Sequence, residues 1–110
     1  MREARIILPL LDNNGASLAH VHSGLKRALC EAFGGYTALL SHGGWIDSES
    51  GKLYEEAGIA YDVAAQEGAD TREKLYAIAS HVARDAAQVC VYVRLPNGEV
   101  IFVDPAKISA

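Results

Sequence analysis

The chain has 110 residues, of which 50% are hydrophobic and 22% are charged, a composition typical of one globular domain. Its net charge of −4 and its dispersed Lys and Arg residues argue against nucleic-acid binding, which needs clustered cations to neutralise phosphates. No segment approaches the roughly 20 apolar residues of a membrane span, and no signal-peptide pattern is visible. We therefore expect a single cytoplasmic domain over residues 1–110 that binds neither membrane nor nucleic acid.

The first predicted element is a strand over Ala4–Leu11, because this short apolar run is typical of a buried strand. A turn cluster follows, and a helix is then predicted with Ser17 as its N-cap. Gly34-Gly35 predicts where that helix ends. Its apolar stripe repeats at steps of three and four residues: Leu18, Val21, Leu25, Leu29 and Phe33.

Two further strands are predicted, one over Tyr36–Ser41 and one within Lys52–Ala65. In the second of these, Ile59, Tyr61 and Val63 alternate with smaller or polar residues, which indicates a half-buried strand. The glycine-rich segment between the two strands, Gly43–Gly51, predicts a hairpin with a long connection.

A second helix is predicted next, starting at a capping-box pattern formed by Asp70 and Glu73. Its apolar face comprises Leu75, Ile78, Val82 and Ala86. The chain then predicts a hairpin with strands over Val89–Leu95 and Glu99–Val103, because Asn97-Gly98 is a strong hairpin-turn signal.

This order of elements, βαββαβ plus a short final strand, predicts an α+β fold of the ferredoxin-like type. By analogy with that fold, we expect a four-stranded antiparallel sheet in the order 4-1-3-2, with two helices on one face. The final strand is expected as an extra hairpin strand.

The first strand is apolar on both of its faces, since Ile6 and Leu8 would point one way and Ile7 and Leu11 the other. Two helices cover only one face, and a bare apolar sheet is unfavourable in water. We expect a homodimer that packs through the open sheet face. The alternative is that the terminal hairpin folds over this face.

The motifs of several common activities are missing. The loop after the first strand has neither the arginine of acylphosphatases nor the CxxC of metallochaperones, and no P-loop or GxSxG is present. His20 and His22 would diverge on a helix, so we expect surface or interface histidines and neither a metal nor a cofactor. Cys30 and Cys90 are expected as partly buried thiols, and Asp12 as a turn cap, with a catalytic base as its alternative.

The segment Phe33–Glu56 is the densest in side chains suited to binding, and it holds the single tryptophan. Trp45 could stack on a ligand or close the hydrophobic core, and Glu56 could accept a hydrogen bond or be a solvated charge. The candidate binding residues are Tyr36, Thr37, His42, Trp45 and Glu56.

The same segment resembles a family of small uncharacterised bacterial proteins. The pattern is carried by Gly34-Gly35, Thr37, Trp45, Asp47, Gly51 and Glu56, with a second patch at Gln88-Val89-Cys90-Val91. The resemblance covers positions 33–93 and implies one ferredoxin-like domain. It singles out Thr37, Trp45 and Glu56 and implies no activity.

These observations lead to a leading hypothesis and two alternatives. The leading one is a non-enzymatic binding or protein-interaction module, a regulator or inhibitor of another protein, acting as a homodimer. Its size and the resemblance further suggest a gene carried by a phage or mobile element. One alternative is a small dimeric α/β-barrel enzyme whose acid–base groups come from His42, His81, Asp12, Tyr36 and Glu56. The other is a small-molecule sensor domain.

Overall fold

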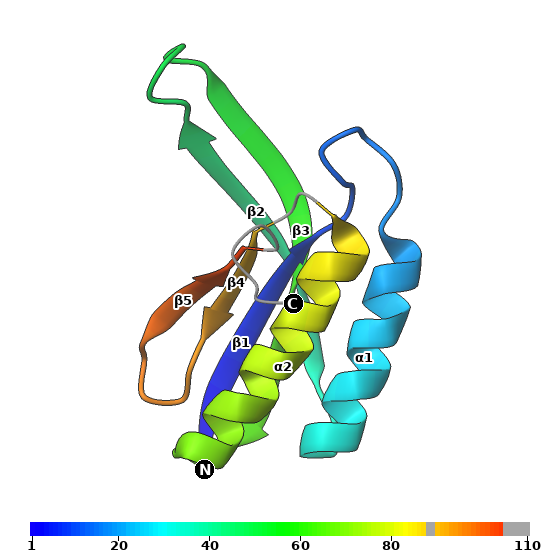
Figure 1. The fold of residues 1–110 in the computed structure, drawn as a ribbon, viewed down its shortest axis with the longest axis vertical. Coiled ribbons are helices and arrows are strands. Elements are labelled where there is room, and N and C mark those ends of the chain that lie inside the picture. Colours follow the sequence, from blue (N-terminus) through cyan, green and yellow to red (C-terminus); the bar gives the residue numbers. More distant parts are fainter. Residues whose placement is uncertain (88–89, 105–110) are drawn as a thin grey trace.

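The computed structural model describes residues 1–87 and 90–104. Within these residues it has two helices and a five-stranded antiparallel sheet, so the predicted α+β class is confirmed (Figure 1). The Gln88-Val89 pair, and with it the predicted start of the fourth strand, lies outside the described residues. The elements are β1 (Arg2–Pro9), α1 (Ala19–Phe33), β2 (Thr37–Ile46), β3 (Leu53–Ala65), α2 (Ala69–Ala86), β4 (Val91–Arg94) and β5 (Val100–Val103).

The strands lie in the order β2-β3-β1-β4-β5. The first four have the neighbours expected from the sequence, but the prediction of a four-stranded sheet is wrong. Gly98, at φ 92°, closes a tight turn, and Leu95 N–H donates to the Glu99 carbonyl at 2.8 Å. This turn returns β5 alongside β4 and extends the sheet, so the alternative of a hairpin folded over the open face is also wrong. The finer assignment to the ferredoxin-like fold stays a prediction.

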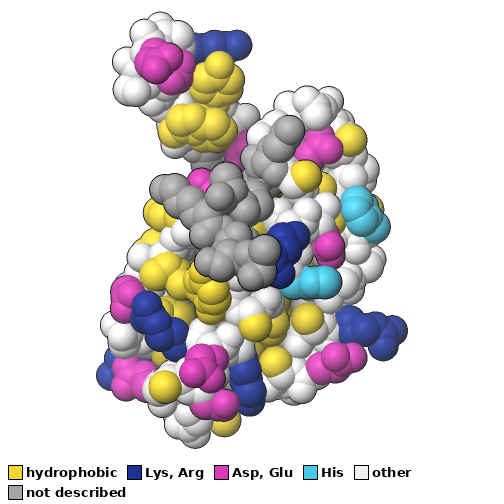
Figure 2. Space-filling model, viewed as in Figure 1, with side chains coloured by type: hydrophobic (Ala, Val, Ile, Leu, Met, Phe, Trp, Pro, Cys, Tyr) yellow, Lys and Arg dark blue, Asp and Glu magenta, His cyan; other side chains and the backbone are white. Residues whose placement is uncertain are grey.

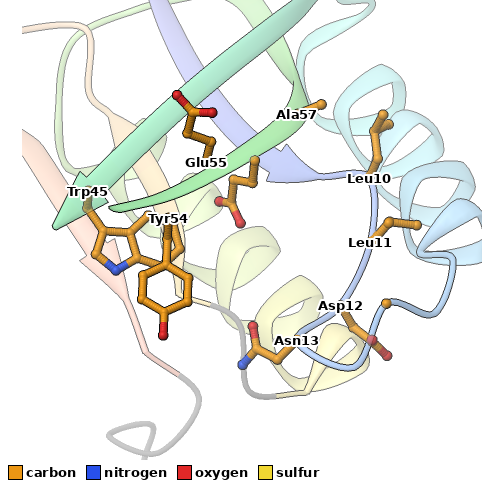
Figure 3. Close-up of a pocket in the computed structure, with 10 residues that line it drawn as sticks. Leu10, Leu11, Asp12, Asn13, Trp45, Tyr54, Glu55 and Ala57 are labelled. Atoms are coloured by element: carbon orange, nitrogen blue, oxygen red, sulfur yellow. The ribbon is translucent and has the colours of Figure 1, made fainter. Parts of the chain in front are cut away.

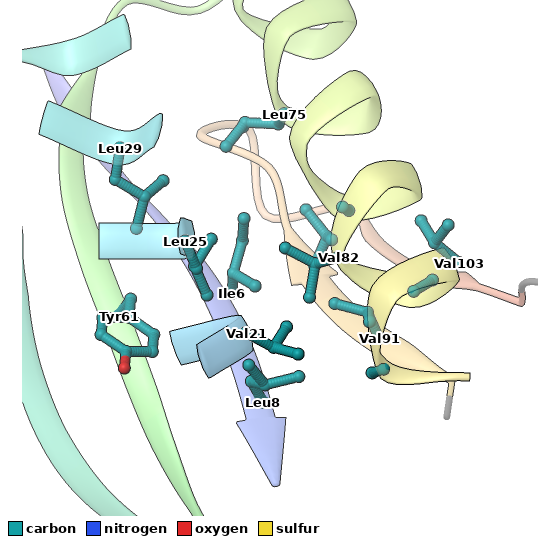
Figure 4. Packing of buried hydrophobic residues seen from close by; sticks show 14 of the residues in the cluster. Ile6, Leu8, Val21, Leu25, Leu29, Tyr61, Leu75, Val82, Val91 and Val103 are labelled. Carbon is teal, nitrogen blue, oxygen red and sulfur yellow. The ribbon is translucent and has the colours of Figure 1, made fainter. Parts of the chain in front are cut away.

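Both helices cover the same face of the sheet, as Figure 1 shows. The alternation of β1 sends Ala4, Ile6 and Leu8 into the core, where each is at most 1% exposed. Figure 4 shows Ile6 lying between Leu25 of α1 and Val82 of α2. The predicted helical stripes therefore form the core, as their spacing requires.

The ends of α1 follow the sequence in part. Gly34 adopts φ 87° and donates its backbone N–H to the Cys30 carbonyl at 2.8 Å, which confirms the predicted end. The N-cap residue is Leu18 and not Ser17, so that prediction is wrong by one residue. Ser17 still contributes at this end, because its hydroxyl accepts a hydrogen bond from Ala19 N–H at 3.1 Å.

The start of α2 differs from the predicted capping box. The N-cap is Gly68, whose φ of 139° suits glycine, so Asp70 lies already inside the first turn. There its carboxylate pairs with Lys74 at 3.1 Å instead of capping the helix. An acidic residue in the first turn is also favourable because the helix N-terminus carries partial positive charge.

The β2–β3 hairpin is much longer than predicted. Gly43 and Gly44 belong to β2, which pairs with β3 as far as Ile46 opposite Leu53, so the predicted long glycine-rich connection is wrong. Asp47 closes a short turn, with its N–H bonded to the Lys52 carbonyl at 2.9 Å. We call residues 42–57 the hairpin arm. It projects beyond the helices (Figure 1), since β1 pairs with β3 only up to Gly58.

The second face of the sheet stands open in the single chain. Phe102 is 67% exposed there and packs edge-on against Tyr92, with ring centroids 5.7 Å apart. A bidentate ion pair interrupts this face, because Nε and Nη2 of Arg5 bond the two Asp62 carboxylate oxygens at 2.6 and 2.8 Å. None of the described helices is long and apolar enough to cross a membrane.

Candidate functional site

A cavity of about 760 Å³ lies between the hairpin arm and the segment that follows β1. Figure 3 shows Trp45 and Tyr54 on one side of it and Leu10, Leu11 and Asp12 on the other. Its size is in the range of small-molecule sites, about 300–1,000 Å³. The lining residues are Leu10, Leu11, Asp12, Asn13, Gly15, Trp45, Tyr54, Glu55, Glu56 and Ala57.

Backbone hydrogen bonds fix the wall that follows β1. Leu10 N–H donates to the Ala57 carbonyl at 3.1 Å, and the Leu10 carbonyl accepts from Leu18 N–H at 3.0 Å. Asp12 Oδ1 accepts from the N–H groups of Asn14 and Ala16 at 2.8 and 2.9 Å. Asp12 is thus the turn cap that its position predicts, and its carboxylate is engaged by the backbone.

The opposite wall carries a stacked aromatic pair. Trp45 and Tyr54 face each other in the β2–β3 register, and their rings lie 5.3 Å apart at 15°. The alternative that Trp45 closes the core is wrong, because the side chain is 52% exposed and is not among the core residues. Stacked rings with exposed surface offer a flat platform for another aromatic ring.

Two carboxylates stand beside this platform, Glu55 and Glu56, both exposed. Successive strand residues point to opposite faces, so Glu56 shares a face of β3 with Tyr54, and Glu55 lies on the other. Within residues 1–87 and 90–104, neither glutamate side chain makes a hydrogen bond or an ion pair. Figure 2 shows hydrophobic and acidic side chains close together on the projecting arm.

A second hollow of about 570 Å³ lies on the open face of the sheet. It shares Asn13, Trp45 and Glu56 with the first cavity, so the two spaces border each other at these side chains. The face of the arm that carries Trp45 and Glu56 therefore borders both spaces. The other lining residues of the second hollow are Ile7, Pro9, Gly44, Cys90, Tyr92 and Phe102.

A buried hydrogen-bond network lies at the end of β1, next to the candidate site. His22 Nε2 lies 2.8 Å from the Pro9 carbonyl and Nδ1 lies 2.6 Å from the Tyr61 hydroxyl. A carbonyl only accepts, so Nε2 carries the proton and the Tyr61 hydroxyl donates to Nδ1. Burial raises the pKa of Tyr61 to about 12. The network fixes the end of β1, from which the Leu10–Asn13 wall continues.

The buried position of His22 contradicts the expectation that the histidines lie at the surface or an interface. The sequence does contain a pattern that predicts the burial of His22. Leu18, His22, Leu25 and Leu29 follow one another at steps of four, three and four residues, which is the spacing of the core-facing stripe. A polar residue at such a position needs buried partners, and Tyr61 supplies one.

The structure brings together two of the five predicted binding residues, Trp45 and Glu56. Tyr36 packs edge-on against Tyr61 at 5.6 Å, Thr37 lies opposite Asp62, and His42 lies opposite Ala57 on the arm. None of these three lines the two cavities. The sequence reasoning missed several lining residues: Leu10, Leu11, Asn13, Tyr54 and Glu55.

Of the acid–base groups named for an enzyme, Asp12 and Glu56 line one cavity together, whereas His42, His81 and Tyr36 do not line it. The part of the chain that the structure describes contains no group of three or more His, Cys, Asp or Glu residues suited to a metal ion. Cys30 and Cys90 are exposed, in contrast to the partly buried thiols expected.

No family model matches the sequence, and no curated protein matches it. Two solved structures share the fold. One is a phage SAM lyase in complex with S-methyl-5′-thioadenosine, with a TM-score of 0.70 and 18% identity over 97% of this chain and 92% of that chain. The other is a phage SAM lyase in the apo state, with a TM-score of 0.68 and 19% identity over 98% and 91% of the two chains.

These neighbours correct the leading hypothesis from the sequence. A non-enzymatic binding or interaction module was expected, whereas both structures with this fold are of an enzyme, SAM lyase. The absence of a known catalytic motif misled the prediction, because a site can be built from aromatic and carboxylate side chains whose spacing has no fixed signature.

Proposed function

We propose that the protein is an enzyme that degrades S-adenosylmethionine (SAM) in the cavity beside the hairpin arm. The observation that carries this proposal is the combination, in one cavity, of a stacked aromatic pair, Trp45 and Tyr54, with the Glu56 carboxylate, which has no ion-pair partner in the part of the chain that the structure describes. The shared fold with SAM lyase supports it over nearly the whole chain.

The chemistry of SAM matches this lining group by group. Its adenine is a flat ring system that would stack on the Trp45–Tyr54 pair. Its sulfonium carries a positive charge, which a nearby carboxylate such as Glu56 would stabilise. Its ribose hydroxyls need hydrogen-bond acceptors, and Glu55 and Glu56 offer carboxylate oxygens at the cavity wall.

The expected nucleoside product is S-methyl-5′-thioadenosine. It keeps the methyl and adenosyl groups, so the bond that breaks joins sulfur to Cγ of the amino-acid chain, and the bonding electron pair goes to sulfur. Two routes that use no water complete the reaction at the four-carbon chain. Either the substrate carboxylate attacks Cγ and forms a lactone, or a base removes a Cβ proton and the C–H electron pair forms an alkene. The first route requires only a bound conformation with the carboxylate behind Cγ.

The test is direct product analysis. Purified protein is incubated with SAM, and S-methyl-5′-thioadenosine and the four-carbon product are measured by chromatography with mass spectrometry, against a protein-free control. Trp45→Ala should lower kcat/KM about tenfold or more, because stacking on one ring contributes about 1–3 kcal/mol. Trp45→Phe keeps a stacking ring and should stay within a few-fold of the parent. Production no faster than in the protein-free control overturns the proposal.

We further propose that residues 1–110 form one ferredoxin-like domain extended by β5, and that a second copy packs against the open sheet face. The strand order β4-β1-β3-β2 with both helices on one face supports the first part. The exposed Phe102 beside Tyr92, and a hollow there that borders the arm, support the second.

A further inference from the structure

We infer that the cavity selects its ligand by charge, and that Glu56 binds a cationic adenosyl compound more tightly than its neutral thioether counterpart. This inference rests on the proposed function and deepens it. It concerns how one site tells substrate from product, since cleavage of SAM converts a sulfonium into an uncharged thioether.

The charged side chains that line the cavity all carry the same sign. Three carboxylates line it, Asp12, Glu55 and Glu56, and none of its described lining residues is Lys, Arg or His. The carboxylate of Asp12 is engaged by two backbone N–H groups, whereas Glu56 makes no ion pair within the described residues. A cation that enters this space is therefore attracted by the lining carboxylates, and the Glu56 side chain has no competing ion-pair partner among the described residues.

The position of Glu56 suits one particular part of an adenosyl ligand. It lies two residues beyond Tyr54 on the same face of β3, which is about 6–7 Å along the strand at the usual rise per residue. A base stacked on Trp45 and Tyr54 would therefore extend its ribose and sulfur toward Glu56. Glu56 also borders the second hollow, so its carboxylate stands where the two spaces meet.

The aromatic platform itself already holds a cation. Nζ of Lys52 lies 5.0 Å from the ring centroid of Tyr54, within the distance at which an ammonium is attracted by an aromatic face. This contact is independent of the carboxylates, and it shows that the electron-rich ring beside the cavity accepts positive charge. A sulfonium at these rings would be attracted by the ring face and by Glu56 and repelled by the Lys52 ammonium, so the preference for a cation rests on the carboxylates.

The consequence for turnover is that the site binds the product more weakly than the substrate. Loss of the positive charge at sulfur removes the attraction to Glu56 while leaving the adenine stacking intact. The product then keeps only the part of the binding energy that it shares with the substrate, and it leaves more readily. A site without carboxylates would lack this part of the discrimination, the part that depends on the charge at sulfur.

The experiment uses two stable ligands that differ in charge at one position. Sinefungin carries a protonated amine in place of the methylsulfonium and cannot be cleaved there, and S-adenosylhomocysteine has a neutral sulfur. Trp45 is the only tryptophan, so quenching of its fluorescence reports binding to the arm. For the wild-type chain, we expect sinefungin to bind about tenfold more tightly than S-adenosylhomocysteine.

The variants isolate Glu56. Glu56→Gln should reduce the preference to about twofold, with the affinity for S-adenosylhomocysteine changed by less than about twofold. Glu73→Gln removes the same charge from the exposed surface of α2 and should keep the full preference. Raising the salt concentration should weaken sinefungin binding more than S-adenosylhomocysteine binding, because exposed charges are screened.

The outcomes separate this inference from the proposed function. Equal binding of the two ligands to the wild-type chain overturns the charge selection, even if SAM is cleaved. A Glu56→Gln variant that weakens both ligands equally overturns the role given to Glu56. If neither ligand binds and SAM is not cleaved, both the proposed function and this inference are wrong.

Discussion

The Tyr61 hydroxyl and Nδ1 of His22 are 2.6 Å apart in the interior of the protein, where they join β3 to α1. Nε2 of the same ring donates to the Pro9 carbonyl at the end of β1. One imidazole therefore connects three elements next to the candidate site. Its effect can be measured separately from catalysis, because neither His22 nor Tyr61 lines the cavity.

Replacing His22 should destabilise the fold. His22→Leu leaves the Tyr61 hydroxyl and the Pro9 carbonyl buried without their partners, and we expect the free energy of unfolding to fall by about 2–4 kcal/mol. Tyr61→Phe removes only one hydrogen bond and should cost about 1 kcal/mol. Urea unfolding followed by circular dichroism gives both values. Equal losses in the two variants would contradict the bridging role of the imidazole.

Breaking the Arg5–Asp62 pair should also destabilise the fold. Asp62 is only 8% exposed, and Asp62→Ala leaves the Arg5 guanidinium without its bidentate partner at a cost of about 1–3 kcal/mol. Glu67→Ala breaks the exposed pair with Arg2, 3.2 Å apart, and should change stability by less than about 0.5 kcal/mol. Similar effects of the two variants in urea unfolding would argue against the importance of burial here.

The same pair predicts a dependence of stability on pH. The hydrogen bonds from Arg5 hold the pKa of Asp62 below its ordinary value in the folded chain. As pH falls, Asp62 is therefore protonated in the unfolded chain before it is protonated in the folded chain. The stability that this pair contributes is present above the ordinary Asp pKa, and it is lost as pH falls through the lowered pKa of the folded chain. Acid titration of unfolding should show a smaller loss of stability in Asp62→Ala than in the wild type.

Gly58 should tolerate no side chain. A Cβ at this position would lie 2.8 Å from the Leu8 carbonyl oxygen, where strands β1 and β3 meet at the base of the arm. We expect Gly58→Ala to cost about 1–3 kcal/mol, because the backbone of β1 cannot move aside cheaply. Gly43→Ala, in the arm, meets nothing within 4 Å and serves as the matched control. Thermal unfolding compares them, and an unshifted midpoint in Gly58→Ala would refute the predicted clash.

Association of copies can be tested at the open sheet face. Light scattering during size-exclusion chromatography should show a dimer for the wild type and a monomer for Phe102→Asp, because a charge would be buried between the sheets. Leu40→Asp is the control: Leu40 is 85% exposed but belongs to the opposite side of β2. Loss of the dimer in both variants, or a wild-type monomer, would overturn the proposed packing.

Much of the architecture could be predicted because local signals agree with the tertiary fold. Gly34 ends α1 as expected, since only a left-handed residue closes that helix easily, and the alternation of Ile59, Tyr61 and Val63 indicates β3 correctly. Gly43 and Gly44 misled the prediction, because glycine usually marks a turn. In the fold they continue β2 by pairing with Glu56 and Glu55.

The site depends on contacts that local patterns do not specify. Trp45 reaches Tyr54 only because the Asp47 turn sets the register of the two strands. A shift of one residue would send one of these rings to the other face of the arm. Leu10 and Leu11 form the opposite wall because the chain leaves the sheet at Pro9, which no periodicity in the first strand announces.

The hairpin arm divides the molecule into parts of unequal local stability. From Leu53 to Glu56, β2 is the neighbour of β3 within the described sheet and no second strand pairs with it, and a two-stranded ribbon is marginal on its own in water. Its amide hydrogens should exchange with solvent far sooner than those of β1, which has strands on both sides. One wall of the cavity can thus open while the core stays folded, so that a ligand can enter and leave without global unfolding.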